Sequence, residues 1–467
     1  MAASLIGAAT GAGLGALAVA LAAASCLVPI YAVILDSRRL GVRDSLFWAL
    51  FVLVLVLPVI HKFTGVRLYF VLELLLIAAA PLLLSEGIAV LRRSKSMRAL
   101  GALLGLFLVI SLMSSVFGRS QIMPGAYQFA TNLKFYFLLL LGFYVAWTRR
   151  TETIFWCCVQ WLWLPMATAL AWQWLEPSTY FSYFGPAHPG PDPLEVFPSR
   201  GMATFQHPSF FAAFSGMMAI IAFCRACVER RFVFYTVSLV YFLLTLASTE
   251  RQEILSIIAI CFAVYIVERG RTPTHSLIAA ILIAAGLTTT FLLPPVQRNL
   301  EREAISWGIL GYTAITHPRP VMYLHAKDIA NSRVPLGSGL GTFGGAGATR
   351  FDDSLHFERG FGRYSWFVER EKYMMDTYWP NILAETGWIG LSLMGAISLF
   401  LIFYPLKKAL FKQSRTQRQY WLMSFAGSSF AFLLSFTSPA YQDPGLVLLM
   451  TLFFGVAHTR PGGNDAS

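Results

Sequence analysis

Three arginines stand out: Arg200 and Arg251 lie in short polar segments next to long apolar blocks, and Arg319 lies in a long segment without such a block. Arg200 comes shortly before the apolar stretch that opens at Pro208, Arg251 belongs to a Ser-Thr-Glu-Arg-Gln-Glu turn, and Arg319 lies in a His-Pro-Arg-Pro sequence. A guanidinium can bind two oxygens of one carboxylate or phosphate, so several brought together could hold a diphosphate. Each arginine could also be a local anchor, either snorkelling at a helix end or forming an exposed ion pair.

Residues near two of these arginines extend the candidate site. Arg319, Tyr323 and Lys327 are four residues apart, so a helix would place them on one face. That basic and aromatic face could be merely solvated, or it could line a groove for a phosphorylated or sugar ligand. His207 precedes Pro208, a pair typical of a helix start, which alone favours a structural role for the histidine.

A glycine-rich stretch and two carboxylates follow. Six glycines fall among the eleven residues 337–347, including Gly339 and Gly341, and such a loop can present N–H groups to an anion. It lacks the Lys-Ser/Thr ending of a P-loop, which argues against nucleotide binding. Asp376, just before Tyr378, could cap a helix or act as a general base. Glu385 should be buried, and an arginine could be its partner.

The composition indicates which elements hold these residues. The chain of 467 residues is 56% hydrophobic and 13% charged, against about 25% charged residues in soluble domains. Its apolar blocks of about 17–25 residues match helices that cross a hydrocarbon core of ~30 Å. A transmembrane β-barrel would instead show short alternating segments. We therefore expect an all-α polytopic membrane protein with a single membrane domain over residues 1–467.

The apolar blocks predict about thirteen spans, or twelve to fourteen if the Gly/Ala-rich first block is counted differently. The N-terminus has no basic n-region, so we expect no cleaved signal peptide. The spans are expected at about 11–35, 45–60, 67–90, 98–117, 134–148, 153–175, 208–227, 232–248, 252–268, 275–292, 381–405, 418–437 and 441–459.

Short basic clusters account for much of the net charge of +12, and their positions predict the orientation. Even numbers of spans separate them, so they lie on one side, which the positive-inside rule makes cytoplasmic. No nucleic-acid-binding motif accompanies them, and we expect no nucleic-acid partner. Two long segments, 176–207 and 293–380, then lie on the opposite side with the three arginines.

The chemistry of this outer set favours a lipid-linked diphosphate. The sequence has no DxD, no HExxH and no carboxylate cluster of recognisable spacing, so we expect no metal and no cofactor. A glycosyl donor with a diphosphate leaving group needs its developing charge neutralised, and without a metal fixed cations must do so. Arginines at the membrane edge would suit a donor whose diphosphate lies at the interface.

The order of these motifs resembles the O-antigen polymerase/ligase superfamily over about residues 195–395. The resemblance rests on Arg200-Gly with His207-Pro208, Ser-Thr-Glu-Arg251, Arg319 with Pro335-Leu-Gly-Ser-Gly339-Leu-Gly341, and Tyr-Trp with Glu385-Thr-Gly387-Trp-Ile-Gly390. It implies a GT-C-like fold in the bacterial inner membrane, with one large periplasmic loop that contains short helices. It also implies that Arg200 and Arg251, and less directly Arg319, bind the diphosphate of an undecaprenyl-linked donor.

One departure from the family separates its two activities. Its ligases carry a histidine near the end of the large loop, where this chain has Asp376-Thr-Tyr-Trp. That difference favours a polymerase, in which a sugar hydroxyl at the non-reducing end of one lipid-linked unit attacks the anomeric carbon of another chain. Undecaprenyl diphosphate would leave, with inversion and without a metal.

The resemblance also implies partners and site residues. The partners would be the lipid-linked donor and acceptor, membrane lipid and a chain-length regulator protein. Asp376 and Glu385 would be catalytic, and the substrate groove would hold His207, Tyr323, Lys327, Gly339, Gly341 and Tyr378. Two alternatives stay open: a ligase that transfers glycan to lipid A core or protein, and a transporter of lipid-linked sugar, although no inverted repeat is visible.

Overall fold

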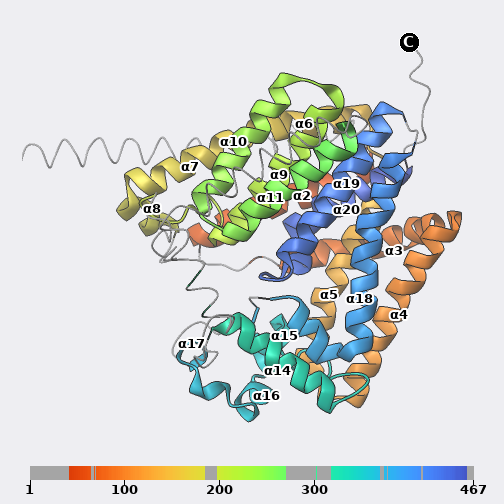
Figure 1. Ribbon diagram of the computed structural model, residues 1–467, viewed down its shortest axis with the longest axis vertical. Coiled ribbons are helices and arrows are strands. Elements are labelled where there is room, and N and C mark those ends of the chain that lie inside the picture. The colour runs from red at the N-terminus through yellow and green to blue at the C-terminus, as the bar shows by residue number, and fades with distance from the viewer. Residues whose placement is uncertain are drawn as a thin grey trace, which may run out of the picture.

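The computed structural model describes most of the chain, namely residues 41–64, 68, 70–184, 197–269, 301, 305, 317–368, 373–375, 377–411 and 414–459. Within these ranges every regular element is a helix and none is a strand (Figure 1). The expected spans at 11–35 and 275–292 lie outside the described residues, and so does Asp376.

The helices follow the apolar blocks of the sequence. Their bounds are α2 (Val42–Thr64), α3 (Phe70–Arg93), α4 (Lys95–Phe117), α5 (Ile122–Tyr144), α6 (Arg149–Trp161), α7 (Trp163–Leu175), α8 (Pro177–Phe184), α9 (Pro208–Glu229), α10 (Phe232–Ser248), α11 (Arg251–Arg269), α14 (Pro318–Ser332), α15 (Ala346–Phe351), α16 (Ser354–Glu358), η1 (Phe361–Arg363), α17 (Ser365–Val368), η2 (Tyr373–Met375), α18 (Trp379–Leu410), α19 (Arg415–Leu434), η3 (Ala440–Gln442) and α20 (Pro444–Thr459).

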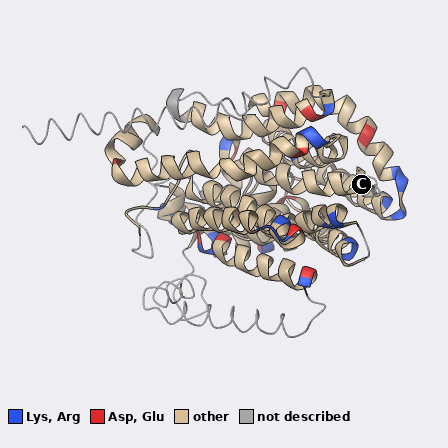
Figure 2. Ribbon diagram, turned by 90° about the horizontal axis from the view of Figure 1, so that it is seen from above, with Lys and Arg blue, Asp and Glu red and all other residues tan. Residues whose placement is uncertain are grey.

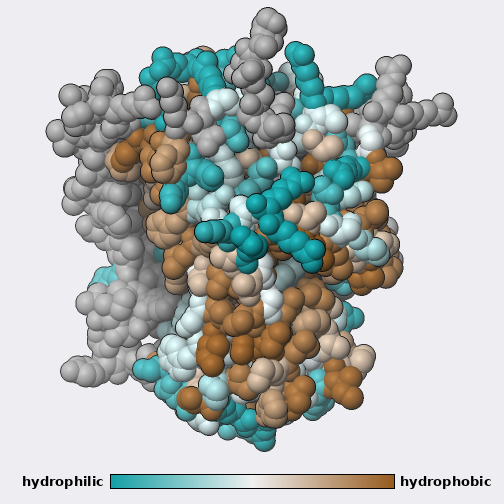
Figure 3. Space-filling view, turned by 90° about the vertical axis from the view of Figure 1, so that its right-hand side faces the viewer, coloured by the Kyte–Doolittle hydropathy of each residue, from teal (hydrophilic) through white to brown (hydrophobic). Residues whose placement is uncertain are grey.

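Six stretches among the described residues are long and apolar enough to cross a membrane: α2, α3, α4, α6 with α7, α9 and α18. Two shorter apolar helices, α10 and α20, accompany them. Leucines of α3 and α4 such as Leu74 and Leu106 are exposed, and Figure 3 shows broad apolar areas on this side of the molecule. A surface of that kind is unusual on a soluble protein and suits contact with lipid. The chain is therefore an all-α multi-pass membrane protein.

Helix α5 differs most from the expected spans because it begins at Ile122 rather than at about 134. Its first turns contain Gln128 and Thr131, which lower the local hydropathy and conceal the helix start in the sequence. Gln128 is buried, and its side-chain oxygen accepts a hydrogen bond from the backbone N–H of Gly347 at 3.1 Å. One face of the beginning of α5 is therefore packed against the glycine-rich part of the chain.

Basic helix ends meet on one face of the bundle. Arg415, at the start of α19, donates to the carbonyl oxygen of Val228 near the end of α9 at 2.7 Å. Arg418 lies 3.2 Å from Glu268 near the end of α11. Figure 2 shows most Lys and Arg segments toward the right-hand side of that view. The ends of α9, α11 and α19 that span counting placed on one side are thus in contact.

The segment between α11 and α18 has a small core of its own in residues 317–368 and 373–375, which we call the outer segment. Met322 of α14 packs there with Phe343, Phe361 and Phe367, and all four side chains are buried. The segment contains short helices, as the resemblance implied, and lies at the foot of α4, α5 and α18 in Figure 1.

Candidate functional site

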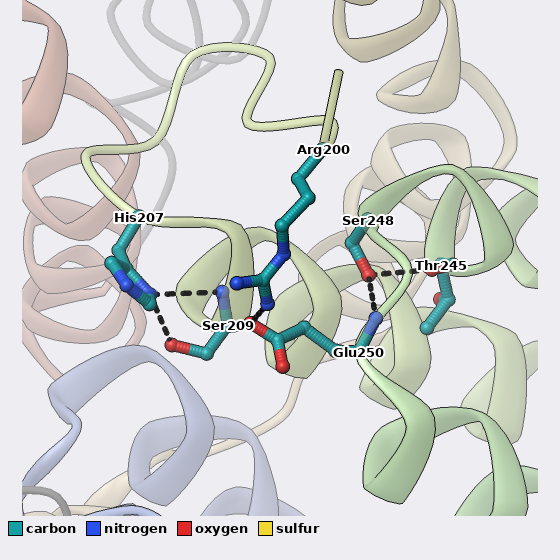
Figure 4. A network of polar contacts seen from close by, with 6 residues as sticks. All are labelled: Arg200, His207, Ser209, Thr245, Ser248 and Glu250. Atoms are coloured by element: carbon teal, nitrogen blue, oxygen red, sulfur yellow. Dashed lines mark hydrogen bonds and ion pairs between the residues drawn. The ribbon is translucent and has the colours of Figure 1, made fainter. Parts of the chain in front are cut away.

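Arg200 forms an ion pair with Glu250, although the two belong to different segments (Figure 4). The backbone next to Arg200 is fixed from two sides: Gly201 donates to the carbonyl oxygen of Ala247 at 2.8 Å, and the Gln173 amide donates to the carbonyl oxygen of Arg200 at 2.8 Å. The side chains of Arg200 and Glu250 are 25% and 16% exposed. The pair is therefore partly shielded from solvent but still accessible.

A tight turn between α10 and α11 positions Glu250. Thr249 adopts a left-handed conformation with φ of 56°, which ends α10. The Ser248 hydroxyl accepts from the Glu250 N–H at 3.2 Å and donates to the carbonyl oxygen of Thr245 at 2.6 Å. Glu250 immediately precedes Arg251, the first residue of α11. The N-terminus of that helix stabilises the negative charge of the Glu250 side chain.

Arg319 reaches the same region from α14. Glu253, in the first turn of α11, is only 3% exposed, and the positive charges of both Arg319 and Arg200 act on its carboxylate. We call Arg200, Glu250, Glu253 and Arg319 the arginine–glutamate cluster. Arg251, the first residue of α11, lies between these two glutamates in the sequence. The structure thus brings the three predicted arginine segments to one place.

Helix α19 provides the support for this arrangement through the carbonyl groups at its end. Gln252 donates its amide to the carbonyl oxygen of Leu433, which joins α11 to α19. Tyr323 donates its hydroxyl to the carbonyl oxygen of Phe436 at 3.0 Å, which joins α14 to the residues after α19. Because the last carbonyls of a helix have no partner within it, these contacts satisfy groups that would otherwise need water.

Some donors of the cluster make no hydrogen bond within the described chain. The Nε atoms of Arg200 and Arg319 are buried and have no partner there, and the same holds for the hydroxyl of Thr249. Buried polar groups in native proteins nearly always have partners, so such atoms call for an explanation. The cluster can therefore offer guanidinium N–H groups to an anion such as phosphate.

Glu385 occupies a different environment. Its Oε1 accepts from the backbone N–H of Phe343 at 3.0 Å, and the N–H groups of Gly341 and Thr342 also act on this carboxylate. With its amide nitrogen facing the carboxylate, Asn381 donates to both carboxylate oxygens at 3.0 Å. The partners of Glu385 among the described residues are thus backbone N–H groups and an amide, instead of the arginine expected from the sequence.

The glycine-rich loop is bound to the bundle by its backbone. Ser338 donates to the carbonyl oxygen of Ala384 at 2.8 Å, and its own carbonyl oxygen accepts from Arg119 at 2.7 Å. Gly339 and Gly341 have φ of 99° and 70°, which only glycine adopts readily. The anion that this loop's N–H groups bind in the structure is therefore the chain's own Glu385.

The remaining predicted residues are dispersed. His207 is exposed and caps α9, accepting from the N–H of Ser209 at 3.2 Å. Lys327 is exposed on α14. Tyr378 is buried in the bundle, with its ring 5.1 Å from that of Tyr441. Asp376 lies outside the described residues.

Sequence reasoning missed the acidic partners of the site. Glu250 and Glu253 were visible in an unusually charged short turn, but local sequence could not pair Glu250 with Arg200. It also missed an ion pair of 2.9 Å between Lys134 of α5 and Glu73 of α3. The usable signal was a charged residue within an apolar block, since such residues are functional candidates by default.

No protein-family model and no curated protein matches the chain. Among the described residues, no three His, Cys, Asp or Glu side chains lie close enough to hold a metal ion.

Proposed function

We propose that this chain is a polysaccharide polymerase, a membrane glycosyltransferase that moves a glycan from undecaprenyl diphosphate to the non-reducing end of a lipid-linked unit. The proposal includes a metal-independent, inverting reaction, a GT-C-like fold and a site that faces the periplasm from the bacterial inner membrane. The arginine–glutamate cluster is the observation that carries it.

The cluster suits a lipid diphosphate for two reasons. First, Arg200 and Arg319 come from segments far apart in the sequence, yet both act on Glu253. Second, each guanidinium has a buried Nε without a partner in the described chain, and a guanidinium fork matches phosphate oxygens. Fixed cations at this position would stabilise the charge that develops on the departing diphosphate.

The proposed sidedness rests on where charge lies in the bundle. The basic ends of α9, α11 and α19 meet on one face, as Arg415 and Arg418 demonstrate, and the positive-inside rule assigns such a face to the cytoplasm. The cluster lies at the opposite ends of α11 and α19, which would then face the periplasm.

Asp376 is the proposed general base. Tyr378, two residues after Asp376, donates its backbone N–H to the carbonyl oxygen of Ser435 at 3.2 Å. The indole N–H of Trp379 donates to the Ser435 hydroxyl at 2.7 Å. The chain after Asp376 is therefore attached to the same end of α19 that contacts α11 and α14.

We expect Asp376→Asn to slow glycan transfer greatly while donor binding survives. Turnover and donor affinity measure the two effects. Unchanged turnover would leave Asp376 only a capping role.

The activity can be tested with the purified full chain in detergent, supplied with lipid-linked repeat units from its own host. Elongated lipid-linked chains, formed without any ion gradient, support the proposal and exclude transport as the sole role. In a strain that lacks the protein, loss of long chains with single units still attached to their final acceptor supports a polymerase. Full-length chains that accumulate on undecaprenyl lipid would instead indicate a ligase.

A further inference from the structure

Glu250 occupies the guanidinium that the proposed function assigns to the donor. In Figure 4 the Arg200 guanidinium and the Glu250 carboxylate point toward each other between the start of α9 and the start of α11. The pair uses Nη2 of Arg200, so it competes with an incoming phosphate for the N–H groups of that nitrogen. A diphosphate that engages the whole guanidinium must therefore displace Glu250.

The surroundings make Glu250 the partner that can move. Its backbone is fixed because its N–H is bound by the Ser248 hydroxyl, and Thr249 sets the turn. Its side chain, in contrast, is partly exposed and has Arg200 as its partner. Rotation about side-chain bonds alone would break the pair, without any change in α10 or α11.

The pair also has a reason to exist when no donor is bound. The Arg200 side chain is three-quarters shielded, and a shielded charge without a partner destabilises the fold. Glu250 neutralises it. A diphosphate carries more negative charge than one carboxylate and can engage Arg200 together with Arg251 and Arg319, so it can displace Glu250.

We propose that Glu250 is a positioning residue that holds Arg200 in the ligand-free protein and yields it to the diphosphate of the lipid-linked donor. The inference rests on the proposed function, since it takes the diphosphate to bind at Arg200. Glu250 would return to Arg200 as undecaprenyl diphosphate leaves. The competition lowers the affinity for this product and thereby favours its release.

The test uses the full chain in lipid nanodiscs, with inorganic pyrophosphate as the probe. Glu250→Gln removes the competing charge, so we expect pyrophosphate to bind about tenfold more tightly than to the wild type, a ratio that corresponds to about 1.4 kcal/mol. Without pyrophosphate the variant should unfold at a lower temperature than the wild type, because Arg200 loses its partner. Pyrophosphate should raise that temperature more in the variant than in the wild type.

Two further variants separate ion exchange from a general effect of charge. Glu250→Asp keeps the charge but shortens the side chain by one methylene, so it should also bind pyrophosphate more tightly than the wild type. In an Arg200→Ala background, Glu250→Gln should no longer change the affinity. Wild-type affinity in both Glu250 variants, or an undiminished gain in the Arg200→Ala background, would overturn the proposal.

Arg200→Ala alone distinguishes failure of this inference from failure of the proposed function. If it weakens pyrophosphate binding while Glu250→Gln has no effect, the anion site stands and only the exchange is wrong. If Arg200→Ala binds pyrophosphate as the wild type does, the donor site itself is misplaced, and both proposals fail.

Discussion

Glu385 and Glu250 are both held by hydrogen-bond donors, but in different ways. Glu385 is 1% exposed and is bound by backbone N–H groups of the glycine-rich loop, such as that of Phe343, and by Asn381. Glu250 is partly exposed and pairs with one flexible side chain, Arg200. Backbone N–H groups cannot turn away without unfolding the loop, whereas a guanidinium and a carboxylate can separate by rotation.

This difference indicates that the two regions have different purposes. The Glu385 site fastens the glycine-rich loop to α18 and is complete without a ligand. The arginine–glutamate cluster keeps buried Nε atoms of Arg200 and Arg319 without partners in the described chain. We therefore expect changes at the cluster to alter activity more than stability, and changes at the loop to do the reverse.

The largest effect should come from the arginines that we assign to the donor. Arg200→Ala and Arg251→Ala should each reduce polymer formation by about a hundredfold or more, the loss typical of removing one donor that stabilises developing charge. Membrane insertion should remain near normal. The matched control is Arg363→Ala, which removes an exposed arginine of the outer segment. If either variant makes polymer of near-normal length, the arginine that it lacks does not bind the donor.

A glycine of the loop should give the largest effect on stability. A Cβ at Gly341 would lie 2.3 Å from the carbonyl oxygen of Pro124, and the φ of 70° is itself unfavourable for alanine. We expect Gly341→Ala to cost about 2–3 kcal/mol or more, since strain of this kind alone costs about 1–3 kcal/mol. Gly362→Ala, where the nearest atom to a new Cβ is 3.6 Å away, is the control. Equal unfolding temperatures for the two variants would contradict the prediction.

Glu385→Gln tests the carboxylate that this loop binds. The amide keeps the shape of the side chain but turns an NH₂ group toward buried backbone N–H donors, which are then left without an acceptor. Because a buried donor without a partner costs about 1–3 kcal/mol, we expect the free energy of unfolding to fall by about 2 kcal/mol. Unfolding of the purified wild type and variant in nanodiscs measures this loss of stability. If stability is unchanged but transfer stops, Glu385 acts in catalysis rather than as an anchor.

Lowering the pH should reduce the free energy of unfolding by a smaller amount, through His356 of the outer segment. Burial lowers the pKa of His356 to about 3, His325 adds to the shift, and Asp352 opposes it. The His356 ring stacks on that of Phe343 at 4.8 Å. Since the unfolded chain binds the proton near pH 6.5 and the fold does not, stability falls as pH drops below 6.5, by about 1.4 kcal/mol per unit. Unfolding temperatures at pH 7.5 and 5.5 should differ less in His356→Phe than in the wild type.

The helices were largely predictable from the sequence, because a membrane-crossing helix needs a continuous apolar stretch of set length. The expected span 232–248 coincides with α10, and that at 208–227 ends two residues short of α9. The start of α5 was not predictable, since Gln128 packs against the glycine-rich loop and interrupts the apolar pattern. Hydropathy describes contact with lipid and contains nothing about contact between segments.

The site was only partly predictable for the same reason. Because Arg200 and Arg319 are arginines, the sequence predicted anion binding, and span counting placed both on one side of the bundle. Their acidic partners depend on the packing of α9, α10 and α11, which local sequence does not encode. Glu385 could be identified as a buried carboxylate, but the loop that binds it lies about forty residues earlier in the chain.

The end of α19 has a mechanical consequence. Its terminal carbonyl region accepts hydrogen bonds from α11 through Gln252, from α14 through Tyr323 and from the start of α18 through Tyr378. At its other end, Arg415 contacts α9. Because α19 is attached at both ends, we expect a displacement of these terminal carbonyls to act on α11, α14 and α18 directly and on α9 through Arg415.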